Sequence, residues 1–462
     1  MSGTALRAGV LTQDKTGWST SPHFFMAMTR PHLIAQAIAD ALLAGTPGIE
    51  EFAGRCAWML GRKHRWIKPL CRRIFHRFGS SLDHRDRSML IEAIRADTGF
   101  EALWNAERRP PRIAHYFLDP PRMAPRQGAL AACNLPSIET PGDLAAWLGI
   151  TAGELDWLAD MHGINPGGGR LCHYRYAWIP KRYGMRLVEA PKPRLRDVQR
   201  RILREILDPV PVHAAAHGFR KGHSCRSFVE PHVGQSVVLR IDLRNFFPGI
   251  PAPRIHALFA TLGYPEAVAR LLTGLCTNCV PRRVAREGNL SWHEAKRLAV
   301  PHLPQGAPTS PALANLCALH LDMRLAGLSE ELGASYTRYA DDLALSGGES
   351  LRRRVGAISG MVTAIAADEG FEVNVRKTRM MHRSDRQLLT GIIVNDKTNI
   401  RRDQYDRLKA ILTNCERSGP ASQNRGNVAD FRAHLAGRVA HVRSLNPSRA
   451  EKLEAILRRI SW

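Results

Sequence analysis

Three aspartates that lie far apart in the chain could together hold divalent metal ions for chemistry at phosphorus. Asp242 follows an apolar run that starts at Ser236, and Asp341 and Asp342 stand side by side between two apolar runs. Mg²⁺ prefers oxygen ligands and keeps several waters, so two or three carboxylates suffice to bind it. Two such ions can activate an attacking hydroxyl and stabilise the leaving oxygen of an in-line displacement. We therefore take these three aspartates as candidate catalytic residues and metal ligands.

Adjacent acids also occur in ordinary solvated turns, because aspartate is a common turn residue. Here the flanking residues Tyr336, Leu343 and Leu345 are apolar. Two carboxylates in such surroundings are costly unless a cation neutralises them. The second strand that ends in Asp242 favours a metal site over a solvated turn.

An aromatic residue stands close to the first acid. Phe247 follows Asp242 by five positions and could lie under the sugar of an incoming nucleotide. A bulky ring there would exclude a 2′-hydroxyl and favour deoxynucleotides. Packing in the core is the alternative, and position alone does not separate the two interpretations.

The elements that position these residues follow from the sequence pattern. Short β-type runs predict strands at residues 236–243, 336–339 and 343–346, the last two joined by a tight acidic turn. Apolar periodicity predicts helices at Arg194–Leu207, Pro253–Leu262 and Ser310–Leu325. This mixture predicts an α+β unit in which helices back an antiparallel sheet.

The pattern also suggests four parts. We expect a mostly helical extension at residues 1–135, a short helical lead-in at 136–170, the α+β unit at 171–395 and a helical tail at 396–462. The segment 61–78 in the extension is basic and aromatic and contains no acid. It could hold a nucleic-acid backbone, or it could be a solvated helix face whose apolar side lies in a core.

The charge balance favours a polyanionic partner. The chain has 66 Lys and Arg against 42 Asp and Glu, a formal net charge of +24. Contacts with phosphates release condensed counterions, so such an excess suits nucleic acid. An anionic membrane and an acidic protein are the alternatives that charge alone leaves open. In the tail, Arg432, Arg438 and Arg443 recur along one expected helix, which could follow the phosphates of a strand or be an ordinary exposed face.

Membrane and secretory signals are absent from the sequence. Residues 1–21 carry no apolar stretch of the signal-peptide type, and no apolar run is long enough to span a bilayer. We expect a soluble protein in the cytoplasm with no membrane partner. Cys276 and Cys279 lack a second pair at zinc-site spacing, so we expect two unpaired thiols in a helix.

Six ordered blocks resemble those of bacterial reverse transcriptases, from about Trp178 to Asn395. The blocks are Ile179-Pro180-Lys181 with Arg186, His217-Gly218-Phe219-Arg220, Asp242 with Phe246-Phe247, the run Leu303 to Pro311, Tyr339-Ala340-Asp341-Asp342, and Val373-Asn374 with Lys377-Thr378. The resemblance implies a right-hand polymerase with fingers, an antiparallel palm sheet and a helical thumb. It implies two Mg²⁺ ions, with Mn²⁺ as a substitute.

The resemblance also implies roles for single residues. Asp242, Asp341 and Asp342 would hold the metals, with the backbone carbonyl of Leu243 as a further ligand. The residues implied to bind the incoming nucleotide are Lys181, Arg186, Phe247, Gln305, Gly306 and Lys377. Those implied to lie along primer and template are Tyr339, Thr390, Gly391, Arg432, Arg438 and Arg443. For Lys377, protonation of the leaving pyrophosphate and an ordinary salt bridge are both open.

Within the family, the chain is most similar to retron reverse transcriptases of the long myxobacterial type. The Gln305 to Pro311 run, the Val373 block and Leu389-Thr390-Gly391 carry this similarity. One departure is the absence of an Asn-Ala-x-x-His pattern, in whose place the basic segment 281–302 stands.

The retron resemblance implies a partner RNA and a product. Such enzymes copy part of a cognate structured non-coding RNA, using dNTPs, into branched single-stranded DNA (msDNA). A role in anti-phage defence and an effector protein as partner are further expectations.

Two other interpretations remain open. The first is a group II intron-like or other defence-associated reverse transcriptase, although an intron protein would be expected to continue beyond the thumb. The second is a non-catalytic RNA-binding protein on the same fold, which would be expected to have lost an acid.

Overall fold

The chain divides into two compact units. The computed structural model describes residues 30–79, 87–106, 111–116, 122–161, 163, 172–180, 184–288 and 290–462. The units are Met1–Pro121 and Arg122–Trp462. This division falls before the boundary expected at residue 135, because Cys133 and Leu135 are buried in the core of the second unit.

The first unit is helical and has its own apolar core. Its helices are α1 Arg30–Leu43, α2 Ile49–Met59, α3 Ile67–Phe78, α4 Arg87–Arg95 and α5 Thr98–Ala106. Helix α3 turns Leu70 and Ile74 into this core, while Arg72 and Arg77 are exposed. The basic segment is therefore a helix face over a core, and its contact with nucleic acid stays a prediction.

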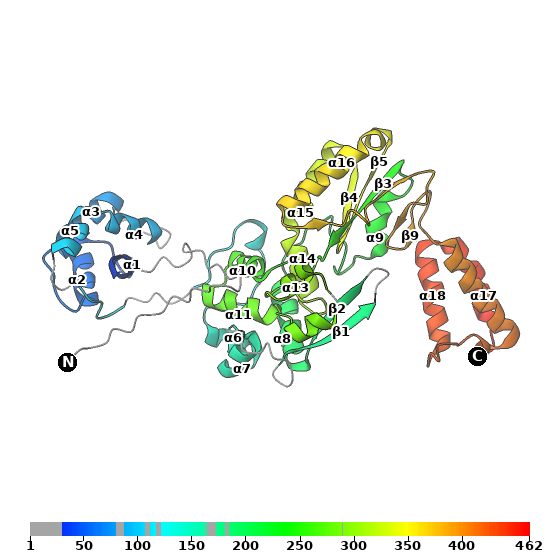
Figure 1. Cartoon of the computed structure of the whole chain (residues 1–462), viewed down its shortest axis with the longest axis horizontal. Helices are drawn as coiled ribbons and strands as arrows, with labels where there is room; N and C mark the ends of the chain where they lie inside the picture. The colour runs from blue at the N-terminus through cyan, green and yellow to red at the C-terminus, as the bar shows by residue number, and fades with distance from the viewer. Residues whose placement is uncertain are drawn as a thin grey trace. The chain divides into compact units, whose positions relative to one another are not determined.

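The second unit is built around an antiparallel sheet (Figure 1). The strands are β3 Val237–Arg244, β4 Ser335–Tyr339, β5 Asp342–Gly347, β6 Glu372–Val373 and β7 Arg379–His382. Their order is β4-β5-β3-β6, and β7 also pairs with β3. Strands β3, β4 and β5 confirm the three strands predicted around the acids.

Helices pack against this sheet, as the α+β prediction requires. They include α15 Leu319–Glu331, which α14 Ser310–Cys317 precedes, and α16 Glu349–Asp368. The prediction of one helix over residues 310–325 was wrong, because the helix breaks at Ala318. The side chain of Arg254 donates to the carbonyl of Cys317 at this break and compensates a helix-end acceptor.

A hairpin of two longer strands precedes the sheet in sequence. It is formed by β1 Tyr174–Pro180 and β2 Met185–Pro191. The surrounding helices are α6 Pro141–Leu148, α7 Ala152–Ala159, α8 Pro193–Ile202, α9 Cys225–Val229, α10 Ala252–Thr261, α11 Glu266–Cys276, α12 Arg282–Glu287 and α13 Trp292–Leu298. Short turns of other helix types lie at Gly128–Leu130, Leu203–Leu207 and Glu230–His232. Cys276 and Cys279 are free thiols, as expected, although only Cys276 lies in a helix.

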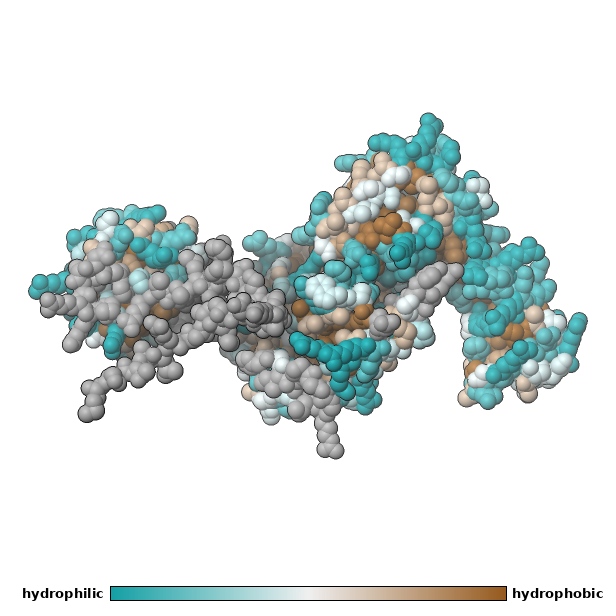
Figure 2. Space-filling model, in the orientation of Figure 1, coloured by the Kyte–Doolittle hydropathy of each residue, from teal (hydrophilic) through white to brown (hydrophobic). Residues whose placement is uncertain are grey.

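The C-terminal part begins with a small sheet and ends in helices. Strands β8 Leu388–Leu389, β9 Ile392–Ile393 and β10 Asn399–Ile400 are followed by α17 Arg402–Ser418, a turn at Pro420–Ser422, α18 Phe431–Leu445 and α19 Pro447–Arg459. Hydrophilic residues cover most of this helical bundle on the face shown in Figure 2. Among the described residues, no helix combines the length and apolar character needed to cross a bilayer.

The contact between α11 and α7 gives a test of the packing. A Cβ added at Gly274 of α11 would lie 2.4 Å from the carbonyl oxygen of Ala159. We expect Gly274→Ala to lower the free energy of unfolding by about 1–3 kcal/mol, because backbone must shift to admit the methyl group. Urea denaturation measures this change.

A matched control is Gly360→Ala, in the middle of α16, where a Cβ meets nothing within 4 Å. This control should stabilise the protein by about 0.5–1 kcal/mol, because alanine is the better helix former. Equal effects of the two substitutions would contradict the packing described here.

Candidate active site

Strand pairing brings the three aspartates together. Asp242 near the end of β3 lies directly opposite Asp342 at the start of β5. Opposite residues of an antiparallel pair share one face of the sheet. Asp341 lies in the tight turn between β4 and β5, and its carbonyl accepts a hydrogen bond from the backbone N–H of Leu243, 2.8 Å away. The end of β3 is thus joined to the acidic turn.

Two cations already contact these acids. The Lys377 ammonium donates to both carboxylate oxygens of Asp242, at 3.0 and 2.9 Å. The side-chain amide of Asn374 donates to the same carboxylate at 3.1 Å. Arg240, two residues before Asp242 on β3, donates from Nε and Nη2 to Oδ1 of Asp342, at 2.9 and 2.7 Å. Each of the two facing acids is therefore neutralised by a neighbouring basic side chain.

Asp341, the third acid, makes no ion pair with a basic side chain of the described residues. Burial raises the pKa of Asp341, and the negative charges of Asp342 and Asp242 raise it further. Burial also raises the pKa of Asp342, although Arg240 opposes that shift. Carboxylates whose charges repel one another in a half-buried site are stabilised by an added cation.

The donor set suits a hard divalent ion, but the side chains are not arranged around one. Across the described ranges, no three His, Cys, Asp or Glu side chains are gathered closely enough to hold an ion as they stand. The contacts of Lys377 and Arg240 account for this, since they direct two of the three carboxylates toward basic groups. An ion at this site must therefore compete with the Lys377 ammonium for Asp242.

A small cavity is lined by two residues expected to bind a nucleotide. Arg186 of β2 and Gln305 both line it, together with Asn245. Its volume is about 60 Å³, which is far below the size of a small-molecule site. Lys181, the other residue expected to contact the triphosphate, lies outside the described residues.

Gly306 and Phe247 line a larger cavity of about 520 Å³. That volume is within the usual range of small-molecule sites. Arg196 and Arg200 of α8 also line it, so a basic helix borders the space. Gly306 has φ 134°, and a Cβ there would lie 3.0 Å from the carbonyl oxygen of Glu189. Glycine is thus needed for the close approach of this loop to β2.

The residues expected along the primer and template lie at two turns. Tyr339 ends β4, with its ring 6.3 Å from that of Phe219. Thr390 and Gly391 form the turn between β8 and β9, with φ values of 45° and 86°. The buried hydroxyl of Thr390 has no hydrogen-bond partner within the described part of the chain.

The three arginines of the tail do not share one face of α18. At about 100° per residue, Arg432 and Arg443 are roughly 20° apart around the helix, whereas Arg438 is more than about 100° from both. Arg443 is paired with Glu454 at 3.0 Å. Burial and the charge of Arg407 lower the pKa of Arg438, so two like charges lie close together there.

Sequence reasoning missed several residues of the site. Arg240 could have been found, because it lies two positions before Asp242 and so shares its face of the strand. The buried pair Glu189 and His302 could not, since these residues are 113 positions apart. His302 contacts the carboxylate of Glu189 at 3.2 Å, and the side-chain amide of Asn278 donates to it at 2.6 Å. The same carboxylate accepts a hydrogen bond from the backbone N–H of Gln305.

Comparison with known proteins identifies relatives of this chain. A family model described as reverse transcriptase (RNA-dependent DNA polymerase) matches residues 179–406. The retron Mx65 reverse transcriptase of Myxococcus xanthus is 41% identical over 335 residues, which cover 72% of this chain and 74% of that protein. The retron Mx162 reverse transcriptase of the same organism is 33% identical over 361 residues, covering 75% and 71%.

One solved structure, a telomerase from Candida albicans, overlaps 61% of this chain and 54% of that chain. Its identity is 12% and its TM-score 0.31. That likeness is too slight to support an argument.

The unpaired acid gives a direct test of ion binding. We expect added Mg²⁺ to raise the thermal unfolding midpoint, because an ion bound only by the folded chain stabilises it by about 2.7 kcal/mol at 100 times its dissociation constant. Asp341→Asn should abolish this shift. Asp156→Asn, an exposed acid of α7, is the control and should keep it. The same shift in all three proteins would contradict the assignment.

Proposed function

The chain belongs to the retron reverse transcriptases and is an RNA-directed DNA polymerase, and we propose that it copies part of a cognate structured RNA into branched single-stranded DNA (msDNA). The observation that carries the choice of site is the pairing of Asp242 with Asp342, with Asp341 in the adjoining turn. The missing Asn-Ala-x-x-His pattern does not exclude the retron subtype, because the similarity extends over most of two retron enzymes.

We propose that Asp242, Asp341 and Asp342, with the carbonyl of Leu243, hold two Mg²⁺ ions or Mn²⁺ in their place. Enzymes of this family generally use divalent ions, and carboxylates are the ligands that these ions prefer. Bound ions would activate the attacking hydroxyl and stabilise the leaving oxygen. The raised pKa of Asp341 supports this proposal, because a cation would relieve the repulsion among the three acids.

Lys377 has a specific place in this scheme. Its ammonium neutralises Asp242 at 2.9 Å, while more than half of its side chain is exposed. An ion at Asp242 would free the ammonium to turn toward the solvent side. There it could donate a proton to the leaving pyrophosphate. Its partner Asp242 is buried, so the contact is not an ordinary salt bridge to a surface acid.

The incoming dNTP would bind between the hairpin β1–β2 and the sheet. Arg186, with Lys181, would hold the triphosphate, since arginine can bind phosphate oxygens with two donors. Gln305 and Gly306 would lie against the nucleotide and the template base. Phe247, at the wall of the larger cavity, would lie under the sugar.

The nucleic acid would continue toward the C-terminal helices. Tyr339 at the end of β4, with Thr390 and Gly391 in the turn between β8 and β9, would lie near the primer terminus. Arg438 and the nearby Arg407 suit the phosphate backbone better than Arg443, which is already paired. Arg432 would contribute from another side of α18.

The wider role follows the family. We propose that the chain acts in the cytoplasm with its own non-coding RNA, in defence against phage together with an effector protein. A non-catalytic RNA-binding protein would not need the acids, and all three are present. Sequencing the nucleic acid that copurifies with the chain, and testing it for a 2′,5′-linked RNA–DNA junction, examines this proposal.

Neutralising the acidic turn should separate catalysis from binding. We expect Asp341→Asn together with Asp342→Asn to abolish DNA synthesis, because the ions lose their charged ligands, while RNA binding stays largely intact. Primer extension and a filter-binding assay measure the two activities. The matched control is Glu330→Gln with Glu331→Gln, an exposed adjacent acidic pair at the end of α15. Primer extension by the aspartate variant would show that the metal site is elsewhere.

Removing the ring of Phe247 should change sugar selectivity. We expect Phe247→Ala to raise incorporation of ribonucleotides relative to deoxynucleotides by about 10- to 100-fold, because the ring no longer excludes the 2′-hydroxyl. Phe247→Tyr keeps the bulk and should keep the selectivity. Single-nucleotide extension with each triphosphate gives the ratio. An unchanged ratio for Phe247→Ala would remove this role and leave the ring as packing.

A further inference from the structure

A fully buried arginine lies directly beneath the acidic turn. Arg338 is in β4, three residues before Asp341, and neither it nor its partner Asp322 of α15 is exposed. Its Nε and Nη2 donate to the two carboxylate oxygens of Asp322, at 2.7 and 2.6 Å. The hydroxyl of Tyr336 donates to the same carboxylate at 2.8 Å. The charge of Arg338 is therefore compensated inside the core.

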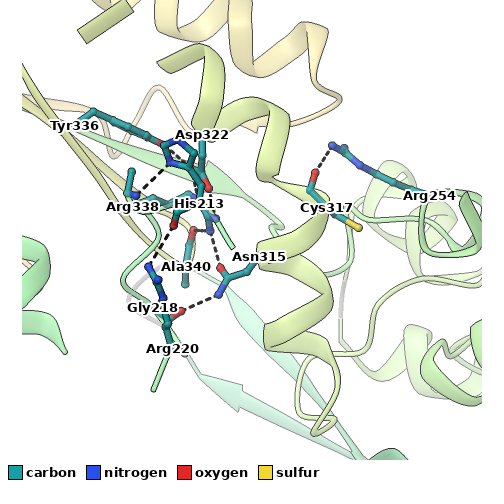
Figure 3. Close-up of polar contacts among 11 residues, drawn as sticks. His213, Gly218, Arg220, Arg254, Asn315, Cys317, Asp322, Tyr336, Arg338 and Ala340 are labelled. Atoms are coloured by element: carbon teal, nitrogen blue, oxygen red, sulfur yellow. Dashed lines mark hydrogen bonds and ion pairs between the residues drawn. The ribbon is translucent and has the colours of Figure 1, made fainter. Parts of the chain in front are cut away.

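The remaining nitrogen of Arg338 reaches the turn itself. Nη1 donates to the side-chain oxygen of Asn315 at 3.0 Å and to the backbone carbonyl of Ala340 at 3.3 Å (Figure 3). Ala340 has φ 55°, a conformation that a residue with a Cβ adopts at a cost. A strained residue of this kind persists only where its surroundings hold it.

The same group of residues also holds a neighbouring loop. Asn315 donates from Nδ2 to the carbonyl of Gly218 at 2.9 Å. The N–H of Arg338 donates to Ala215, and the N–H of His217 donates to Arg338, so the loop runs along the edge of β4. A Cβ at Gly218 would lie 2.6 Å from the backbone nitrogen of Ala340. The loop therefore lies flush against the acidic turn.

We propose that Arg338, with Asp322 and Asn315, positions the acidic turn for catalysis. The arginine fork holds the carbonyl of Ala340, which fixes the left-handed backbone and so the direction in which Asp341 and Asp342 leave the turn. This inference rests on the proposed function of those two acids.

Stability alone does not account for such a pair. Replacing a buried ion pair with apolar side chains of similar size is often neutral or stabilising. The planar guanidinium instead supplies donors in fixed directions, and one of them is directed at the turn. A positioning role uses that geometry, whereas packing would not require it.

The test replaces the pair without leaving a buried charge. Arg338→Met together with Asp322→Leu keeps the volume of the core, and the thermal unfolding midpoint shows whether the variant is folded. Primer extension well below that midpoint gives kcat, KM for dNTP and the Mg²⁺ concentration for half-maximal rate. We expect kcat to fall by about 100-fold, as for a misplaced catalytic group. The Mg²⁺ requirement should rise, and KM for dNTP should change little.

Two further variants complete the test. Arg254→Met removes another arginine of Figure 3, which donates to the carbonyls of Cys317 and Glu369 and not to the turn. This control should lower stability without changing the Mg²⁺ requirement. Asn315→Ala leaves the ion pair in place and removes only the side-chain hydrogen bonds of Asn315, to Nη1 of Arg338 and to the carbonyl of Gly218. It should raise the Mg²⁺ requirement, and it keeps the test decisive if the double variant fails to fold.

The outcomes separate this inference from the proposed function. Suppose that the wild type is active and the Asp341→Asn/Asp342→Asn variant is inactive. An unchanged kcat and Mg²⁺ requirement in folded Arg338→Met/Asp322→Leu, or in Asn315→Ala, would then overturn only the positioning role. Primer extension by the double aspartate variant would overturn the proposed function, whatever Arg338 does.

Discussion

The register between β3 and β5 is the constraint on which the site depends. It sets Asp242 opposite Asp342, and the buried neighbours Ile241 and Leu343 hold that register because they must stay in the core. A slip of one residue would turn the side chains of one strand to the opposite face of the sheet. Two acids that are 100 positions apart in the chain would then no longer meet. The apolar flanks that suggested the site in the sequence are thus also the residues that assemble it.

Charge balance is the second condition. Three carboxylates in a half-buried site repel one another, and the ion pairs of Lys377 with Asp242 and of Arg240 with Asp342 offset part of this repulsion. Among the described residues, Asp341 has no ion pair of its own, and burial and the two neighbouring acids raise its pKa. Beneath the turn, the charge of Arg338 is neutralised by Asp322 and not by the acids of the site. On one face of the hairpin, Lys377 and Arg240 therefore neutralise acids of the site, and on the other face Arg338 holds the backbone of the turn.

Much of the fold and the central acids could be predicted, because they depend on local patterns. Apolar runs predicted strands β3 and β5, and the two aspartates between apolar runs predicted the turn that joins β4 to β5. The break at Ala318 was missed because residues 310–325 have uninterrupted helical spacing, and the partner that caps the break, Arg254, is distant in sequence. The contacts of Arg338 with Asp322 and Asn315 were missed because a buried arginine leaves no local signal. The tail arginines were predicted as one group, and the helix separates them, since helical periodicity spreads positions 432, 438 and 443 around its axis.

Locating the ions would test directly whether Asp242, Asp341 and Asp342 hold them. Crystals of the chain with RNA, primer and Mn²⁺ would give anomalous scattering at the manganese absorption edge. We expect peaks in contact with Asp242 and Asp341, with the Lys377 ammonium moved away from Asp242. Peaks at other carboxylates, or an intact Lys377–Asp242 contact with no ion beside the acidic turn, would contradict this expectation.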